Sequence, residues 1–213
     1  MTGERKEGTN NQKAGQAGKA KAAPSGASTD RRIRKTRAAL KKSLTTLLQQ
    51  KSVKDISVRE VSELADVNRA TFYLHYKDVF DLLEQSEQDL LSELHAVIDE
   101  IPGDVIQKRP VLLFEKVYGL CRENADLVRI LLGENGDIRF LNNLNIFLKE
   151  KCLNDWSAYI RQTELKNFDA FFSFLVGGCC SLLQYWFSTG MKQSPGDLAL
   201  ITVEFLNRNT GEA

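Results

Sequence analysis

Several side chains between residues 57 and 77 have the chemistry of nucleic-acid recognition. The guanidinium group of Arg69 can donate two parallel hydrogen bonds to a guanine edge, and Ala70 or Thr71 can contact the methyl group of a thymine. Tyrosine, histidine and lysine side chains follow, and these suit phosphate oxygens, which position a protein without reading the DNA sequence. Solvated arginines, and a capping or packing role for His75, are the competing interpretations. The candidate DNA-binding residues are Arg59, Asn68, Arg69, Ala70, Thr71, Tyr73, His75 and Lys77.

The same stretch predicts two short helices joined by a tight turn. Ser57 is a favourable N-cap, and Glu60, three residues later, completes a capping box. The apolar pattern then breaks, and Asn68 can cap a second helix from Arg69 to about Leu74. A helix, a short turn and a second short helix form the helix-turn-helix arrangement, which places its second helix in the DNA major groove. The apolar side chains expected to face the core are Val58, Val61, Leu64, Ala65, Phe72 and Tyr76.

A longer helix is predicted ahead of this unit, from Arg31 to about Lys51, with Asp30 or Thr29 as its cap. Its first half is crowded with basic side chains that can reach phosphates. Ile56 is placed to act as a hydrophobic staple before the next helix. This long helix is expected to support the helix-turn-helix from behind.

Helical periodicity also dominates the chain after residue 77. Asp78 is expected to cap a helix that runs to about Glu100 and is stopped by Pro102 and Gly103. No run of residues predicts a strand. The fold is therefore expected to be all-α, with an N-terminal three-helix DNA-binding domain followed by a helical body, about nine helices in all. Further helices are expected at about 110–122, 125–132, 137–162, 165–189 and 195–208, with breaks at 133–136 and 194–196.

Charge is distributed unevenly along the chain, although the net charge is only +1. Residues 31–77 carry 12 basic and 4 acidic side chains, whereas residues 78–213 carry 12 basic and 21 acidic ones. A basic head on an acidic body is typical of a polyanion-binding head. Residues 1–30 have almost no large apolar side chain and are expected to be a disordered tail, solvated or touching DNA as a basic arm. The expected parts are the tail (1–30), the helix-turn-helix domain (31–77) and a helical regulatory body (78–213).

The other chemistry-bearing residues do not match an enzyme or a metal site. The cysteines form no CxxC pair, and the chain has only two histidines. Neither a nucleophile elbow, nor a phosphate loop, nor a signal region is present. We therefore expect no catalytic residue, no metal ion, no cofactor and a cytoplasmic protein with reduced thiols. The cysteines are Cys121, Cys152, Cys179 and Cys180.

The segment from Ala170 to Met191 contains 22 residues without a charge, which is long enough to span a membrane. Serine, threonine and glutamine residues dilute its apolar character, and the neighbouring helices are amphipathic. A helix that is buried in a core and an interface is the simpler interpretation, so no membrane partner is expected.

Residues 31–83 resemble the DNA-binding head of TetR/AcrR-type transcriptional regulators. The matching motif is VSELADVNRATFYLHY, from Val61 to Tyr76, followed by Lys77-Asp78 and Leu82-Leu83. The segment from Phe171 to Ala199 is similar to the penultimate helix of one branch of that family. The resemblance implies a homodimer whose last two helices form a four-helix interface, and a body that binds a small-molecule inducer.

Two positions depart from the family pattern. Asp66 stands where the family usually has glycine, and aspartate tolerates a left-handed backbone better than most residues. Val79 replaces a lysine that often meets a phosphate, so that contact is not expected here, and Lys77 is placed to compensate.

The leading hypothesis is a homodimeric repressor of transcription that a small-molecule effector releases from double-stranded DNA. Two-fold symmetry would place two recognition helices about 34 Å apart, or a multiple of that distance, on a palindromic operator. The alternative is a regulator-like coactivator or interaction module that acts through a partner protein. Plain core packing is the competing interpretation for each aromatic residue that is a candidate wall of an effector pocket. These residues are Phe114, Tyr118, Phe140, Phe147, Trp156, Phe174 and Trp186.

Overall fold

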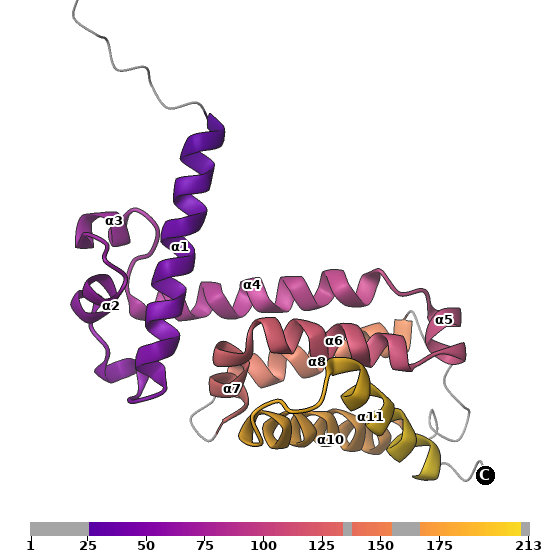
Figure 1. Cartoon of the computed structure of the whole chain (residues 1–213). Coiled ribbons are helices and arrows are strands. Elements are labelled where there is room, and N and C mark those ends of the chain that lie inside the picture. The colour runs from indigo at the N-terminus through magenta and orange to yellow at the C-terminus, as the bar shows by residue number, and fades with distance from the viewer. Residues whose placement is uncertain (1–25, 134–137, 155–166, 210–213) are drawn as a thin grey trace, which may run out of the picture.

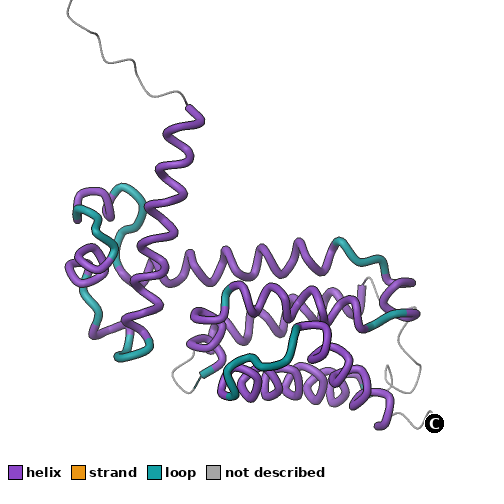
Figure 2. The backbone as a smooth tube through the Cα atoms, in the orientation of Figure 1, coloured by secondary structure: helices purple, strands orange, loops and turns teal. Residues whose placement is uncertain are grey.

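A computed structural model describes residues 26–133, 138–154 and 167–209. Within these ranges the chain forms ten α-helices and one short 3-10 helix, without a strand, which confirms the all-α prediction (Figures 1 and 2). The helices are α1 (Gly26–Leu48), η1 (Val53–Asp55), α2 (Val58–Leu64), α3 (Arg69–Tyr73), α4 (Val79–Asp99), α5 (Gly103–Lys108), α6 (Val111–Glu123), α7 (Ala125–Leu132), α8 (Ile138–Asn154), α10 (Phe168–Ser188) and α11 (Pro195–Asn209).

The head, formed by α1, α2, α3 and the first turn of α4, has a hydrophobic core of its own. Phe72 and Tyr76 are buried in it, as predicted, with exposed fractions of 0% and 2%. Ile56 and Val61 share this core, so the expected staple is present. The buried core side chains are Leu40, Leu44, Ile56, Val61, Phe72, Tyr76, Val79 and Leu82.

Helix α4 joins the head to the body. Asp78 caps it as predicted, because its side chain accepts a hydrogen bond of 2.8 Å from the backbone N–H of Asp81. Val79 lies in the head core, Leu90 lies in the body core, and Leu83 packs against both. Figure 1 shows α4 leaving the head beside α1 and running along the body. The same helix therefore contributes side chains to both cores.

The body packs α4, α6–α8, α10 and α11 around a core that includes the fully buried Trp186. Tyr118 of α6 and Thr202 of α11 are joined by a buried hydrogen bond of 2.8 Å, which fixes these two helices together. Helix α10, on the side of the body away from α4, is long and apolar enough to cross a membrane. It instead packs against the body, but only 28% of its most apolar window is buried within the protomer.

Two helices differ from the sequence predictions. Helix α1 begins at Gly26, so neither Thr29 nor Asp30 caps it, and residues 26–30 continue the helix. No glycine or proline interrupts the residues after Gly26, so helical propensity carries the helix upstream of the expected boundary. Residues 1–25 of the predicted tail lie outside the described residues.

The second difference is the short helix α5, which the sequence did not predict. Pro102 and Gly103 end α4 as expected, but Pro102 then serves as the N-cap of a new helix that stops before Pro110. Helix α8 is described as Ile138–Asn154, within the predicted range. The rest of its predicted length and Trp156 fall outside the described residues.

Candidate nucleic-acid interface

The predicted capping box fixes the start of α2. The hydroxyl of Ser57 accepts a hydrogen bond from the Glu60 N–H, and the Ser57 N–H donates to the Glu60 carboxylate at 3.0 Å. The Lys51 ammonium donates to the same carboxylate at 2.6 Å. The Lys51 and Ser57 hydrogen bonds together lower the pKa of Glu60 from 4.5 to about 2, with Lys51 as the largest cause. Glu60 is therefore ionised throughout the neutral range and joins α2 to the segment that follows α1.

Asp66 makes the turn between α2 and α3. Its φ of 52° lies in the left-handed region, as expected for a residue that stands in a glycine position. The Val67 N–H donates to the Ser62 carbonyl at 2.9 Å, and the Asp66 N–H donates to the Glu63 carbonyl at 3.3 Å. These two bonds form a Schellman motif, which ends α2 and aims the chain into α3.

Helix α3 presents its polar face outward. The Asn68 side-chain oxygen accepts a hydrogen bond of 2.8 Å from the Ala70 N–H, so Asn68 caps α3 as predicted. Since Phe72 is buried, the residues on the other side of this short helix face solvent. Arg69 and Ala70 are exposed, and Thr71 is half-buried.

The candidate phosphate-binding residues lie at the end of α3 and in the connection to α4. Tyr73 is 59% exposed, with its ring set edge-on against Phe72 at a centroid distance of 5.6 Å. His75 is half-buried beside the Tyr76 ring. Lys77 is exposed on the connection to α4, where its N–H donates to Asp81 at 2.7 Å.

The structure adds to the sequence prediction at Arg59 and Leu74. The Arg59 guanidinium donates to the Glu63 carboxylate at 2.6 Å, and this bond raises the pKa of Arg59. To reach a base edge, Arg59 must give up or share that ion pair. Leu74, directly after α3, is 80% exposed, and it was not among the predicted site residues. The inward positions of Phe72 and Tyr76 were the signal that Leu74 faces outward.

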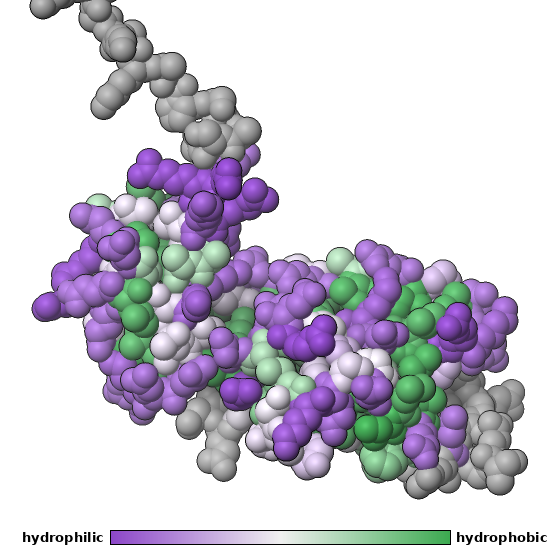
Figure 3. All heavy atoms as spheres, viewed as in Figure 1, coloured by the Kyte–Doolittle hydropathy of each residue, from purple (hydrophilic) through white to green (hydrophobic). Residues whose placement is uncertain are grey.

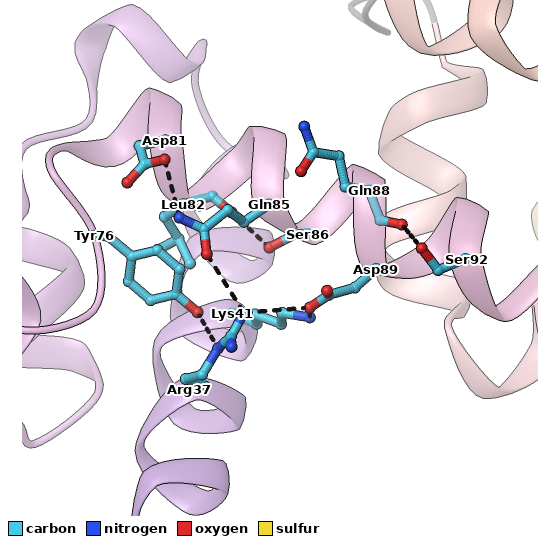
Figure 4. A network of polar contacts seen from close by, with 10 residues as sticks. All are labelled: Arg37, Lys41, Tyr76, Asp81, Leu82, Gln85, Ser86, Gln88, Asp89 and Ser92. Atoms are coloured by element: carbon cyan, nitrogen blue, oxygen red, sulfur yellow. Dashed lines mark hydrogen bonds and ion pairs between the residues drawn. The ribbon is translucent and has the colours of Figure 1, made fainter.

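A polar network ties α1 to α4 behind the recognition surface (Figure 4). Arg37 donates to the Tyr76 hydroxyl at 3.1 Å and forms an ion pair of 3.6 Å with Asp89. Lys41 also pairs with Asp89, and Arg37 reaches Gln85 at 3.4 Å. The Tyr76 hydrogen bond is the main cause of the raised pKa of Arg37.

Arg37 and Lys41 are therefore committed to α4, although the sequence placed them among the α1 side chains that can reach phosphates. The sequence did not predict this contact with α4. A signal was present, because Arg37 and Lys41 lie one helical turn apart on α1, and Gln85 and Asp89 lie one turn apart on α4. Such spacing places each pair on one face of its helix. The basic side chains near the start of α1 remain exposed, and Figure 3 shows hydrophilic groups gathered there. These are Arg31, Arg32, Arg34 and Lys35.

Metal chemistry has no evident place in the part of the chain that the structure describes. No group of three or more histidine, cysteine, aspartate or glutamate side chains there could hold a metal ion.

Comparisons with known proteins agree with this geometry. A TetR family model described as "Transcriptional regulator C-terminal region" matches residues 112–208. The HTH-type transcriptional regulator YxbF of Bacillus subtilis (strain 168) is 34% identical over 53 residues. That match covers 25% of this chain and only 14% of YxbF.

Two solved structures share the fold. The TetR transcriptional regulator from Streptococcus agalactiae 2603V superposes with a TM-score of 0.52 at 23% identity, covering 83% of this chain and 96% of that one. The fatty acid degradation regulator FadR from Bacillus halodurans superposes with a TM-score of 0.59 at 14% identity, covering 82% and 93%. At these identities the two structures establish the arrangement of helices alone.

Proposed function

We propose that the chain is a TetR-type homodimeric repressor that binds a palindromic operator in the cytoplasm, because a TetR family model matches residues 112–208 and the helices are arranged as in a solved TetR regulator. The family is not enzymatic. The observation that carries the proposal is the outward face of α3. Phe72 is held in the head core while Arg69 and Ala70 stand in solvent at the N-terminal end of the helix.

The base readers lie at the start of α3 in this proposal. Arg69 donates to a guanine edge, and Ala70 and Thr71 contact a thymine methyl group. The Asn68 side-chain oxygen is engaged by the cap, so its amide hydrogens are the groups that donate to a base. Leu74 adds an apolar contact to a thymine methyl group or a sugar.

The backbone contacts come from residues that flank α3. Tyr73, His75 and Lys77 hold phosphates on one side, and the exposed basic side chains at the start of α1 add charge. Arg59 reaches the DNA by exchanging its ion pair with Glu63 for a base edge or a phosphate. The working division is a DNA-binding head (31–77) and a regulatory body (78–213), with α4 connecting the two.

A second copy of the chain is the partner proposed for α10 and α11. Phe174 and Tyr185 of α10, and Leu200 and Phe205 of α11, are each more than half exposed in the protomer. A groove of about 340 Å³ runs between the two helices. Monomeric proteins rarely expose contiguous apolar patches of this kind, and a two-fold partner would cover them. Figure 3 shows apolar side chains gathered where α11 lies.

Selection of DNA from a random duplex pool by the purified protein tests this function. We expect enrichment of a palindrome whose half-sites lie about one helical turn, or a multiple of it, apart. Failure to enrich any sequence, or enrichment of a site without two-fold symmetry, would count against the proposal.

Repression is tested with a reporter that carries the selected site. Its expression should rise when the gene for this protein is deleted, whereas a fall would identify an activator.

A further inference from the structure

The ion pair of Arg59 and Glu63 lies on the exposed side of α2. The Nε atom of Arg59 and the Oε1 atom of Glu63 are 2.6 Å apart, and the two side chains are 66% and 61% exposed. Residues four apart on a helix share one face, so Glu63 accompanies Arg59 on the surface of the head. Arg59 is a candidate base reader, whereas the Glu63 carboxylate has no hydrogen to donate to a phosphate.

Helix stability is a poor explanation for this pair. Arg59 is the second residue of α2, and Glu63 is the last but one. A cation near the start of a helix and an anion near its end both oppose the helix dipole. An arginine that precedes its glutamate by four residues is also the less favourable order for such a pair. Exposed ion pairs contribute little to stability in any case, so the pair is better explained by what this surface binds.

The Arg59 guanidinium has two kinds of partner on DNA. A phosphate is an anion, as the Glu63 carboxylate is, whereas a guanine edge offers two acceptors without a net charge. Because Glu63 stands one turn away on the same helix, it stays near the guanidinium even after the ion pair has been exchanged. A phosphate that takes its place is therefore held close to a negative charge, and a guanine edge is spared this repulsion.

We propose that Glu63 is a specificity-determining residue of the head, which steers Arg59 away from phosphates and toward a guanine edge. This inference rests on the proposed function, because it requires α2 to lie against DNA. Two like unit charges about 6 Å apart in water repel by roughly the thermal energy, which corresponds to about a threefold change in affinity. Glu63 thereby weakens binding to DNA in general and raises the preference for sites with a guanine opposite Arg59.

Glu63→Gln tests this role, because glutamine keeps the shape of the side chain and removes its charge. Affinity for a random duplex should rise about threefold, and affinity for the selected duplex of equal length should rise less, so the preference falls. On the random duplex, the slope of log affinity against log salt concentration should steepen by about one, because Arg59 then neutralises a further phosphate. Either an unchanged preference or an unchanged slope would overturn the proposal.

Two controls separate this role from a general effect of charge. Glu84→Gln removes one acidic charge from an exposed position on α4 and should leave the preference unchanged. In an Arg59→Met background, Glu63→Gln should also leave the preference unchanged, because no guanidinium is present to be steered. An effect that persists without Arg59, or equal effects of Glu63→Gln and Glu84→Gln on the preference, would show that Glu63 does not act through Arg59.

The two proposals fail separately. A palindrome that the wild type and Glu63→Gln prefer over random DNA to the same extent leaves the function and removes the role of Glu63. If no palindrome is enriched, the function fails. The affinity and the salt slope on the random duplex then still decide whether Glu63 keeps Arg59 from phosphates.

Discussion

Asp66 holds the left-handed position of the turn, where a Cβ atom is costly. Asp66→Gly should therefore raise the free energy of unfolding by about 0.5–1 kcal/mol, and Asp66→Ala should lower it by about 1 kcal/mol, because alanine lacks the short polar side chain that tolerates this backbone. Urea unfolding of the wild type and the two variants gives the order of their unfolding free energies. An alanine variant as stable as the glycine variant would show that backbone strain does not govern this position.

Glu60 makes the stability of the head depend on pH in the acid range. A lowered pKa means that folding favours the charged carboxylate, so this stabilisation is complete above pH 4.5 and is lost as the pH falls toward about 2. The difference in unfolding free energy between wild type and Glu60→Gln should be constant at neutral pH and shrink over that window. Lys51→Met should flatten the same dependence, because Lys51 is the largest cause of the shift. A difference that does not vary with pH would contradict this.

The local signals in the head were predictable because each joins residues close in the chain. Ser57, Asn68 and Asp78 cap the helices that they precede, and Asp66 occupies the turn as expected. The contact of Arg37 with Tyr76 and Asp89 was not predictable, because it depends on how α1 crosses α4. In the sequence, Arg37 looks the same as its exposed basic neighbours.

The polar network between α1 and α4 fixes the position of the head relative to the connecting helix. Arg37→Met keeps the apolar stem but removes the donor to the buried Tyr76 hydroxyl and the ion pair with Asp89. Since the guanidinium is partly exposed, we expect a loss of about 1 kcal/mol in unfolding free energy. Arg34→Met, on the exposed part of α1, is the matched control and should change nothing. Equal effects of the two substitutions would remove the positioning role from Arg37.

At the scale of the molecule, assembly is predicted to depend on the apolar faces of α10 and α11. Phe174 is 60% exposed in the protomer, so Phe174→Glu should leave the fold intact but yield monomers in sedimentation experiments. Phe80→Glu is the matched control, because Phe80 is similarly exposed (54%) but lies on α4 near the head. A dimer that survives Phe174→Glu at micromolar concentration would place the interface elsewhere.

The helices of the body were predictable from the sequence, but the cavity between them was not. Phe140 and Leu144 lie one helical turn apart on α8, and that pattern is the same whether a side chain fills a core or lines a cavity. Only the packed arrangement brings the four cysteines together around one space. The charge difference between head and body, by contrast, is visible in the sequence. It agrees with the proposal that the head binds DNA and the body does not.

The most direct test of base reading by α3 compares affinity for the selected operator with affinity for a random duplex of equal length at fixed salt. Arg69→Ala should reduce that preference by about 1–3 kcal/mol. Lys77→Ala should weaken binding to both duplexes alike and keep the preference. It should also reduce the slope of log affinity against log salt concentration by about one. If Arg69→Ala weakened binding to both duplexes equally, the claim that α3 reads bases through Arg69 would be contradicted.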